Sequence, residues 1–100
     1  MTSVAYAQAA LRDLEQLTDF LFGTDPDAAI ETVELVRSAI EILDLHPLIG
    51  RPIESGLREL VISRGRSGYL ALYAYDSFRD RVMVLAVRHQ REAGYASPEG

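Results

Sequence analysis

The sequence contains no cysteine, and all ten of its cationic residues are arginine. Because it has no cysteine, the chain can form neither a disulfide framework nor a thiolate site, and a reducing cytoplasm is the compartment that we expect. Because it has no lysine, no such side chain is available as a general base, whereas every positive group can make a forked contact to carboxylate or phosphate. The arginine bias also follows from genomic base composition, so it assigns no site by itself.

Zinc-ligand patterns and long apolar runs are absent as well. The two histidines, His46 and His89, lie in opposite halves of the chain, and no segment approaches the roughly 20 apolar residues of a membrane-spanning helix. The first residues lack a charged leader followed by an apolar stretch. We therefore expect a soluble cytoplasmic protein that binds neither metal nor membrane. At 100 residues and 48% hydrophobic content, it is expected to fold as one domain, 1–100, with a flexible tail at about 96–100.

Charge is unevenly distributed along the chain, whose net charge is −5. Residues 1–56 hold three arginines against ten acidic residues, whereas residues 57–100 hold seven arginines against five. Neutralisation of phosphates supplies most non-specific affinity for nucleic acids, so direct binding to them is not expected of an acidic chain. The acidic residues of the first half are expected to form a solvated face, made of Asp13, Glu15, Asp19, Glu31, Glu34 and Glu41.

Two segments have the periodicity of helices. Between Ala7 and Gly23 the leucines recur at spacings of three or four, which predicts a first helix with Leu11, Leu14, Leu17 and Leu21 in its apolar row. The second segment opens with Asp25 as N-cap and Pro26 in the first turn, and Pro47 is predicted to end it. The short connection between the two segments predicts an antiparallel helical hairpin.

Four segments have the features of strands. A short one, 3–6, precedes the helices, and three more follow a loop with two prolines and two glycines, at 57–63, 68–76 and 81–89. The short links between these three predict an antiparallel meander. The predicted fold is therefore α+β in the order β-α-α-β-β-β, with the helical hairpin packed on one face of a small, mostly antiparallel sheet.

The strand at 68–76 is apolar on both faces. Tyr69, Tyr73 and Tyr75 alternate with Leu70 and Leu72, so neither side is polar. Two helices can cover only one face, and a lone soluble chain rarely exposes a second apolar strip. Either the loops and the C-terminal tail cover that strip or a partner does. The tyrosines are expected in the core, although an exposed row of them would also stack on RNA bases.

A group of polar side chains follows the last strand, namely Arg88, His89, Arg91 and Tyr95. A metal-independent ribonuclease needs a base, an acid and cations around the phosphate, and these residue types supply them. A surface that binds another protein uses the same residue types. His89, at the end of an apolar strand, is more typical of a partly buried polar residue than of a catalytic acid.

Several motifs occur in a distinctive order between about residue 4 and residue 95: ALRDLEQLTDFL, DPDAAIETVELVRSAIEIL, HPLIGRP, LRELVI, GYLALYAY and VMVLAVRHQRE. This ordered set resembles the RelE/ParE superfamily of toxins from type II toxin–antitoxin modules. The resemblance implies the same β-α-α-β-β-β fold, an antitoxin that neutralises the toxin by direct contact, and no cofactor. RelE-like members of the superfamily cut messenger RNA in the ribosomal A site, whereas ParE-like members inhibit DNA gyrase.

Three sheet positions favour the ParE-like branch. RelE-like ribonucleases place basic side chains there, and an ungapped alignment from the GYxxxY pattern assigns these positions to Val61, Ser63 and Leu70, none of which is basic. A shifted register would bring in Arg64 or Arg66 instead. The absence of cations at these positions leaves phosphodiester cleavage without the charge stabilisation that it requires.

The resemblance also implies which residues bind the partners. We expect target binding, with DNA gyrase as the target, at Arg88, His89, Arg91 and Tyr95; in a RelE-like ribonuclease the same four residues would be catalytic. The expected antitoxin is ParD-like, of the ribbon-helix-helix class, and its expected contacts are Leu14, Leu17, Leu21, Arg58, Leu70 and Leu72. Two alternatives remain, a ribosome-dependent endoribonuclease and a non-toxic protein that acts with the antitoxin as a corepressor.

Overall fold

The computed structural model of the chain describes residues 2–62 and 68–89. Along the chain it has strand β1 (Ser3–Tyr6), helices α1 (Gln8–Phe22) and α2 (Pro26–Glu41), the 3-10 turn η1 (Ile42–Asp44), strand β2 (Arg51–Pro52), the 3-10 turn η2 (Glu54–Gly56) and strands β3 (Leu57–Val61), β4 (Tyr69–Asp76) and β5 (Arg81–His89). The expected features at Ser63, in the turn that follows it and after His89 lie outside the described residues.

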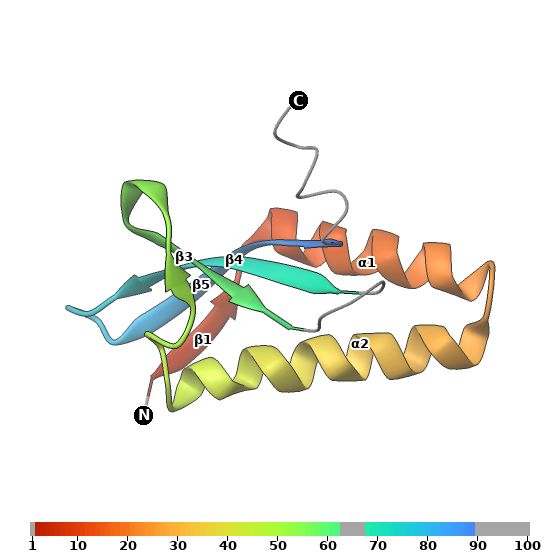
Figure 1. Cartoon of the computed structure of the whole chain (residues 1–100), viewed down its shortest axis with the longest axis horizontal. Helices are drawn as coiled ribbons and strands as arrows, with labels where there is room; N and C mark the ends of the chain where they lie inside the picture. The colour runs from red at the N-terminus through yellow and green to blue at the C-terminus, as the bar shows by residue number, and fades with distance from the viewer. Residues whose placement is uncertain (1, 63–67, 90–100) are drawn as a thin grey trace.

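The strands form one sheet in the order β1-β5-β4-β3-β2 (Figure 1). β1 runs parallel to β5 and every other pair is antiparallel. Both helices lie on the same side of the sheet, which confirms the predicted α+β fold. The prediction of a plain loop before β3 was wrong at β2, where Arg51 pairs with Glu59 and Pro52 with Arg58. A strand of two residues has no periodicity of its own, because its register is set by its neighbour.

The start of α2 agrees with the prediction, and its end does not. The Asp25 carboxylate accepts hydrogen bonds from the backbone N–H groups of Asp27 and Ala28, and Pro26 is the first residue of the helix. The α-helix ends at Glu41 and tightens into η1, so it stops well before Pro47. The N–H of Thr2 donates to the carbonyl of Asp44, which ties the end of η1 to the first strand.

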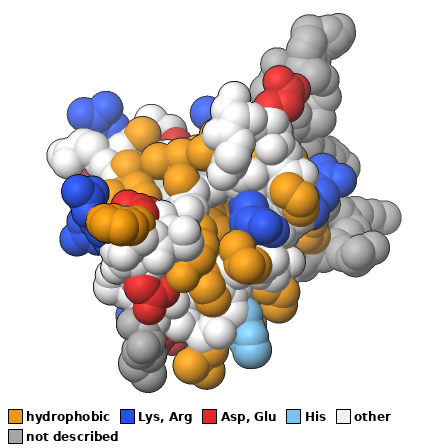
Figure 2. All heavy atoms as spheres, turned by 90° about the vertical axis from the view of Figure 1, so that its left-hand side faces the viewer, with side chains coloured by type: hydrophobic (Ala, Val, Ile, Leu, Met, Phe, Trp, Pro, Cys, Tyr) orange, Lys and Arg blue, Asp and Glu red, His pale blue; other side chains and the backbone are white. Residues whose placement is uncertain are grey.

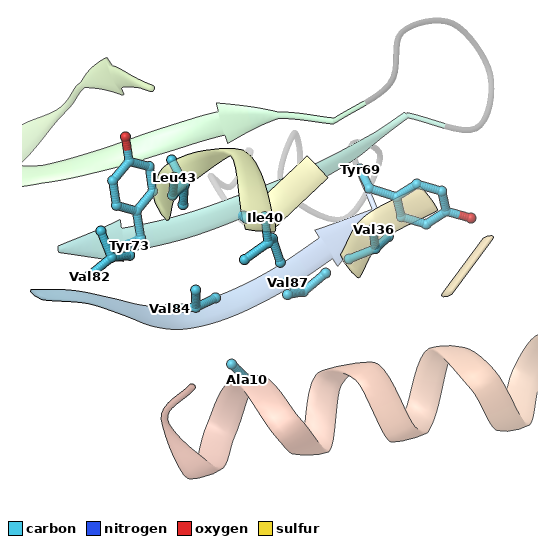
Figure 3. Close-up of a cluster of buried hydrophobic side chains, with 10 residues drawn as sticks. Ala10, Val36, Ile40, Leu43, Tyr69, Tyr73, Val82, Val84 and Val87 are labelled. Carbon is cyan, nitrogen blue, oxygen red and sulfur yellow. The ribbon is translucent and has the colours of Figure 1, made fainter. Parts of the chain in front are cut away.

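The core lies between the helical hairpin and one face of β4 and β5 (Figure 3). Tyr69 and Tyr73 of β4 point toward the helices, and Tyr73 is completely buried. This confirms that the tyrosine side of β4 belongs to the core. The other main contributors are Ala10 of α1, Val36 and Ile40 of α2, Leu43 of η1, and Val82, Val84 and Val87 of β5.

A bulge in β5 decides which of its side chains face the helices. Leu72 pairs with Ala86, but the next residue of β4, Tyr73, pairs with Val84, so Leu85 is an extra residue. An extra residue shifts the alternation of the strand by one position. Because of this shift, Val84 and Val87 are both buried although they are three residues apart, and Arg88 is turned to the opposite face.

Candidate functional site

The candidate site is the face of the sheet that the helices leave uncovered, here named the open face. The pairing registers place on it Leu57, Glu59 and Val61 of β3, Leu70, Leu72 and Ala74 of β4, and Met83 and Ala86 of β5. None of these residues is fully buried, whereas the alternate residues Ala71 and Tyr73 are. The apolar strip predicted from the sequence is therefore present on the open face, without cover from the described residues.

Cations lie at the margins of the open face. Arg51 of β2 forms a 2.7 Å ion pair with Glu59, so its charge is paired within the sheet although its side chain is largely exposed. Arg81 and Arg88 are exposed at the two ends of β5. Their partners on β4, Asp76 and Leu70, are six residues apart, so at about 3.4 Å per residue the two arginine backbones are roughly 20 Å apart. Within the described strands, no two unpaired guanidinium groups converge on one position of the open face.

The row that would carry the chemistry of a ribonuclease is mainly apolar. Val61 of β3 pairs directly with Leu70 of β4, and Leu70 pairs with Arg88 of β5. Two of the three sheet positions that carry basic side chains in RelE-like ribonucleases thus lie side by side here, and both are apolar. The third, Ser63, lies outside the described residues, as do Arg64 and Arg66.

The structure separates the two described residues of the predicted target-binding group. Arg88 is exposed on the open face, whereas His89 is turned to the helix-covered face, where its ring meets that of Tyr69 edge-on with centroids 5.2 Å apart. This agrees with a partly buried polar role for His89. The other two residues, Arg91 and Tyr95, lie outside the described residues.

The residues predicted to contact an antitoxin lie on two different sides of the molecule. Leu14 and Leu17 of α1 pack against the core, and Leu21 follows on the same helix, half-buried. Leu70 and Leu72 lie on the open face, with the sheet between them and the helix. A single segment of a partner would have to pass around the edge of the sheet to reach both groups.

Arg58, the sixth residue of that set, is held by its own chain. Its guanidinium donates to the carbonyls of Leu48 and Gly50 at 3.1 and 2.7 Å. The Tyr73 hydroxyl holds the same loop, because it donates to the carbonyl of Pro47 and accepts from the N–H of Gly50. Burial raises the pKa of the Tyr73 phenol.

Gly50 is required by this close approach. A Cβ at Gly50 would lie 2.7 Å from the Tyr73 ring and hydroxyl and 2.9 Å from the carbonyl of Glu59. Neither neighbour can move easily, because Tyr73 is packed in the core and Glu59 lies within β3. The loop of the HPLIGRP motif is therefore held against the sheet by hydrogen bonds with Tyr73 and Arg58 and by the close approach that Gly50 permits.

Asp13 has a role that the sequence did not reveal. Its carboxylate accepts a 2.9 Å hydrogen bond from the backbone N–H of Val87. β1 pairs with β5 only as far as Val84, so this N–H points to an edge that none of the described strands covers. The prediction that Asp13 belongs to a solvated face was therefore wrong, and its spacing from Ala10 and Leu17, in the inner row of α1, was the available signal.

A second network fixes the turn between β4 and β5. Asp80 accepts hydrogen bonds from the hydroxyls of Thr2 and Tyr75 at 2.6 and 2.7 Å. The bond from Thr2, and then that from Tyr75, hold the pKa of Asp80 below its ordinary value, and the bond to Asp80 raises the pKa of Tyr75. These contacts connect Thr2, at the start of the chain, to the turn between β4 and β5.

Three kinds of functional feature are not found among the described residues. Between residues 2 and 62 and from 68 to 89, no three side chains of His, Asp or Glu gather as metal ligands. None of the helices in these ranges is long and apolar enough to cross a membrane. Within the same ranges, no base, acid and cations converge on the open face in the way that phosphodiester cleavage requires.

Comparisons with known proteins identify the family of the chain. The family model described as the ParE toxin of the type II toxin-antitoxin system parDE matches residues 4–94. Toxin RelE3 of Caulobacter vibrioides is 35% identical over 92 residues, which are 92% of this chain and 98% of that relative. The chain therefore belongs to the ParE toxin family of type II toxin–antitoxin systems.

Solved structures share the fold. A chain of the chromosomal ParDE system from P. aeruginosa has a TM-score of 0.72 at 20% identity, with 89% of this chain and 96% of that chain covered. A chain of the RelBE2 toxin–antitoxin complex from Mycobacterium tuberculosis has a TM-score of 0.59 at 28% identity, with 88% and 96% covered. The fold is thus common to proteins with ParE and RelE names, and it does not separate the two activities.

Proposed function

We propose that this toxin inhibits DNA gyrase by direct binding, without hydrolytic chemistry, and that a cognate ParD-like antitoxin neutralises it. The observation that carries the proposal is the direct pairing of Val61 with Leu70 on the open face. Cleavage of RNA develops negative charge around the phosphate and needs donors or cations there. Apolar side chains at these positions favour protein contact instead.

The target-binding residues are proposed to be Arg88 and, beyond the described strands, Arg91 and Tyr95. Arg88 is exposed on the open face beside Leu70, so its guanidinium can reach a carboxylate of a protein partner. His89 supports this end of β5 through its contact with Tyr69. Its proposed role is therefore to position Arg88 and the residues that follow.

The antitoxin is proposed to cover the open face at Leu70 and Leu72. An apolar strip of this kind is a typical place for a partner segment, and covering it would also block access to Arg88. The similar chains in the ParDE system and the RelBE2 complex belong to toxin–antitoxin systems, which supports an antitoxin as the partner. Leu14, Leu17 and Leu21 would take part only if the antitoxin wraps around the sheet edge.

Purified protein and purified DNA gyrase test the proposal in a supercoiling assay. The wild-type chain is expected to inhibit supercoiling, and Arg88→Ala is expected to raise the half-inhibitory concentration about tenfold or more, as the loss of an interfacial arginine often does. Arg37→Ala, an exposed arginine of α2, is the matched control and should behave as wild type. Undiminished supercoiling at a large excess of wild-type protein would refute gyrase as the target.

A ribosome-dependent endoribonuclease is the second candidate. The 35% identity to Toxin RelE3 favours it, together with the exposed Arg88 on the open face. Ribosomes with bound messenger RNA distinguish the two functions. Cuts in the A-site codon that depend on Arg88, with gyrase unaffected, would establish the nuclease. If the protein affects neither gyrase nor message, it acts only as a partner of its antitoxin.

A further inference from the structure

The turn between β4 and β5 presents a bare aromatic side chain. Phe78 is 96% exposed, the largest exposed fraction among the big hydrophobic side chains of the described residues. The turn lies at the end of the sheet opposite to Arg88, at the left of Figure 1. Single exposed apolar residues are common on protein surfaces, so exposure alone assigns no role to Phe78.

The backbone on both sides of Phe78 is fixed by hydrogen bonds. The Asp76 carboxylate accepts from the N–H groups of Phe78 and Arg79, which closes the turn on one side. On the other side, Asp80 adopts a positive φ of 52° and is bonded to Thr2 and Tyr75 through its side chain. A conformation fixed in advance reduces the entropy lost when the exposed ring binds.

The charge offered at this turn is positive. Arg79 keeps 74% of its side chain exposed, and its distance to Asp76 is 3.8 Å, at the limit of an ion pair. Arg81 is also exposed, on the margin of the open face. The two acidic residues of the turn, in contrast, use carboxylate oxygens within the fold. Figure 2 faces this end of the molecule and shows arginine and hydrophobic side chains next to one another on its surface.

This combination fits an acidic protein surface with an apolar pocket. Aromatic residues and arginine are enriched among the residues that dominate protein–protein affinity. Two cations neutralise too few phosphates for stable binding of nucleic acid by a chain of net charge −5. A membrane surface would gain only about 1 kcal/mol for each cation. A protein with carboxylates around a pocket satisfies both the ring and the guanidinium groups.

The turn lies close enough to the proposed target site for one partner to contact both. The backbones of Arg81, beside the turn, and Arg88 are roughly 20 Å apart, because their partners on β4 are six residues apart. An interface of standard size buries about 800 Å² on each partner, which corresponds to a patch roughly 30 Å across. One partner on the open face can therefore reach Arg88 and the turn at the same time.

We infer that the β4–β5 turn is a second anchor for the toxin's target, with the Phe78 ring entering an apolar pocket and Arg79 and Arg81 meeting carboxylates around it. This inference rests on the proposed function, because the target it names is DNA gyrase. It adds a contact at the end of the sheet opposite to the C-terminal residues.

Phe78→Ala tests the anchor in the gyrase supercoiling assay, with Phe20→Ala as the matched control. Phe20 is a 73% exposed phenylalanine on α1, so its removal deletes the same surface chemistry elsewhere. Phe78→Ala is expected to raise the half-inhibitory concentration about tenfold or more, while Phe20→Ala stays within about twofold of wild type. Thermal unfolding should show an unchanged Tm for Phe78→Ala, since its ring contacts solvent.

The other outcomes of these assays separate the anchor from the gyrase proposal. Inhibition by wild type that Phe78→Ala fully retains overturns the anchor and leaves the gyrase proposal standing. If wild type does not inhibit gyrase, the gyrase proposal fails, and growth arrest on expression then tests the turn. Loss of arrest for Phe78→Ala alone supports the turn as a target contact. Equal arrest by all variants, or arrest by none of them, overturns the anchor. Flotation with phosphatidylserine vesicles that depends on Phe78 would assign the turn to a lipid surface and also overturn the inference.

Discussion

The two faces of β4 have similar composition and opposite surroundings. Tyr69, Ala71 and Tyr73 are buried under the helical hairpin, whereas Leu70 and Leu72 lie on the open face. Both rows are apolar, so hydrophobicity alone does not decide which one faces the core. The helix-covered row is distinguished by the hydroxyl of Tyr73, which forms hydrogen bonds with Pro47 and Gly50 in the loop before β3. Substitutions on the two faces should therefore separate stability from binding.

The largest expected effect is that of Tyr73→Ala. The side chain is completely buried, and its hydroxyl bonds two backbone groups of the HPLIGRP loop. Removal of a buried aromatic side chain costs about 3–5 kcal/mol of unfolding free energy. Urea denaturation followed by circular dichroism measures this loss. Tyr73→Phe is the matched variant and should lose about 1–3 kcal/mol, because it only leaves the loop groups unpaired. Equal losses for both variants would show that cavity formation contributes little.

A smaller loss is expected for Asp13→Ala. Its carboxylate is the partner of the Val87 N–H at the uncovered edge of β5, and an unpaired backbone donor at a partly buried edge costs about 1–3 kcal/mol. Amide hydrogen exchange at Val87 should accelerate along with the global destabilisation. Glu15→Ala, on the exposed side of α1, is the control and should change stability by about 0.5 kcal/mol or less. A variant at Asp13 as stable as this control would remove the capping role.

Sequence reasoning recovered the elements with local signals and missed those set by distant neighbours. Asp25 and Pro26 mark the start of α2 through contacts within one turn, and they were predicted correctly. β2, the parallel pairing of β1 with β5, and the bond from Val87 to Asp13 all join residues far apart in the chain. The bulge at Leu85 likewise depends on pairing with β4.

The candidate site divides in the same way. The apolar open face could be predicted from the alternation around Leu70 and Leu72, because a strand exposes alternate residues to opposite sides. That Arg88 and His89 point to opposite faces also follows from alternation. Which of them faces the helices depends on the bulge. Arg58 was expected to contact the antitoxin, whereas its bonds to the loop carbonyls depend on the folded position of residues 48–50.

A pH-dependent effect is expected at Asp80, where the start of the chain meets the β4–β5 turn. Hydrogen bonds from Thr2 and Tyr75 hold its pKa below the ordinary value of 3.8, so the folded chain binds this proton less tightly than the unfolded chain. The associated stability is complete above about pH 4 and is lost as the pH falls through the lower folded-state pKa. Asp80→Asn, which tolerates the positive φ, should show a weaker fall in urea midpoint between about pH 5 and pH 2. Parallel pH profiles would contradict this role.

The smallest effect on stability, and the largest on binding, is expected for Leu72→Ser. Leu72 is half-buried on the open face, between Glu59 and Ala86 in the sheet. Its replacement should therefore change the unfolding free energy by only about 1 kcal/mol or less. Ala71→Ser is the matched change on the helix-covered face, where Ala71 is completely buried; a hydroxyl there costs about 1–3 kcal/mol if it finds no partner. Titration calorimetry with an antitoxin encoded beside the toxin should show weakened binding for Leu72→Ser and unchanged affinity for folded Ala71→Ser. Unchanged affinity for Leu72→Ser would instead exclude Leu72, and with it the centre of the open face, from the antitoxin interface.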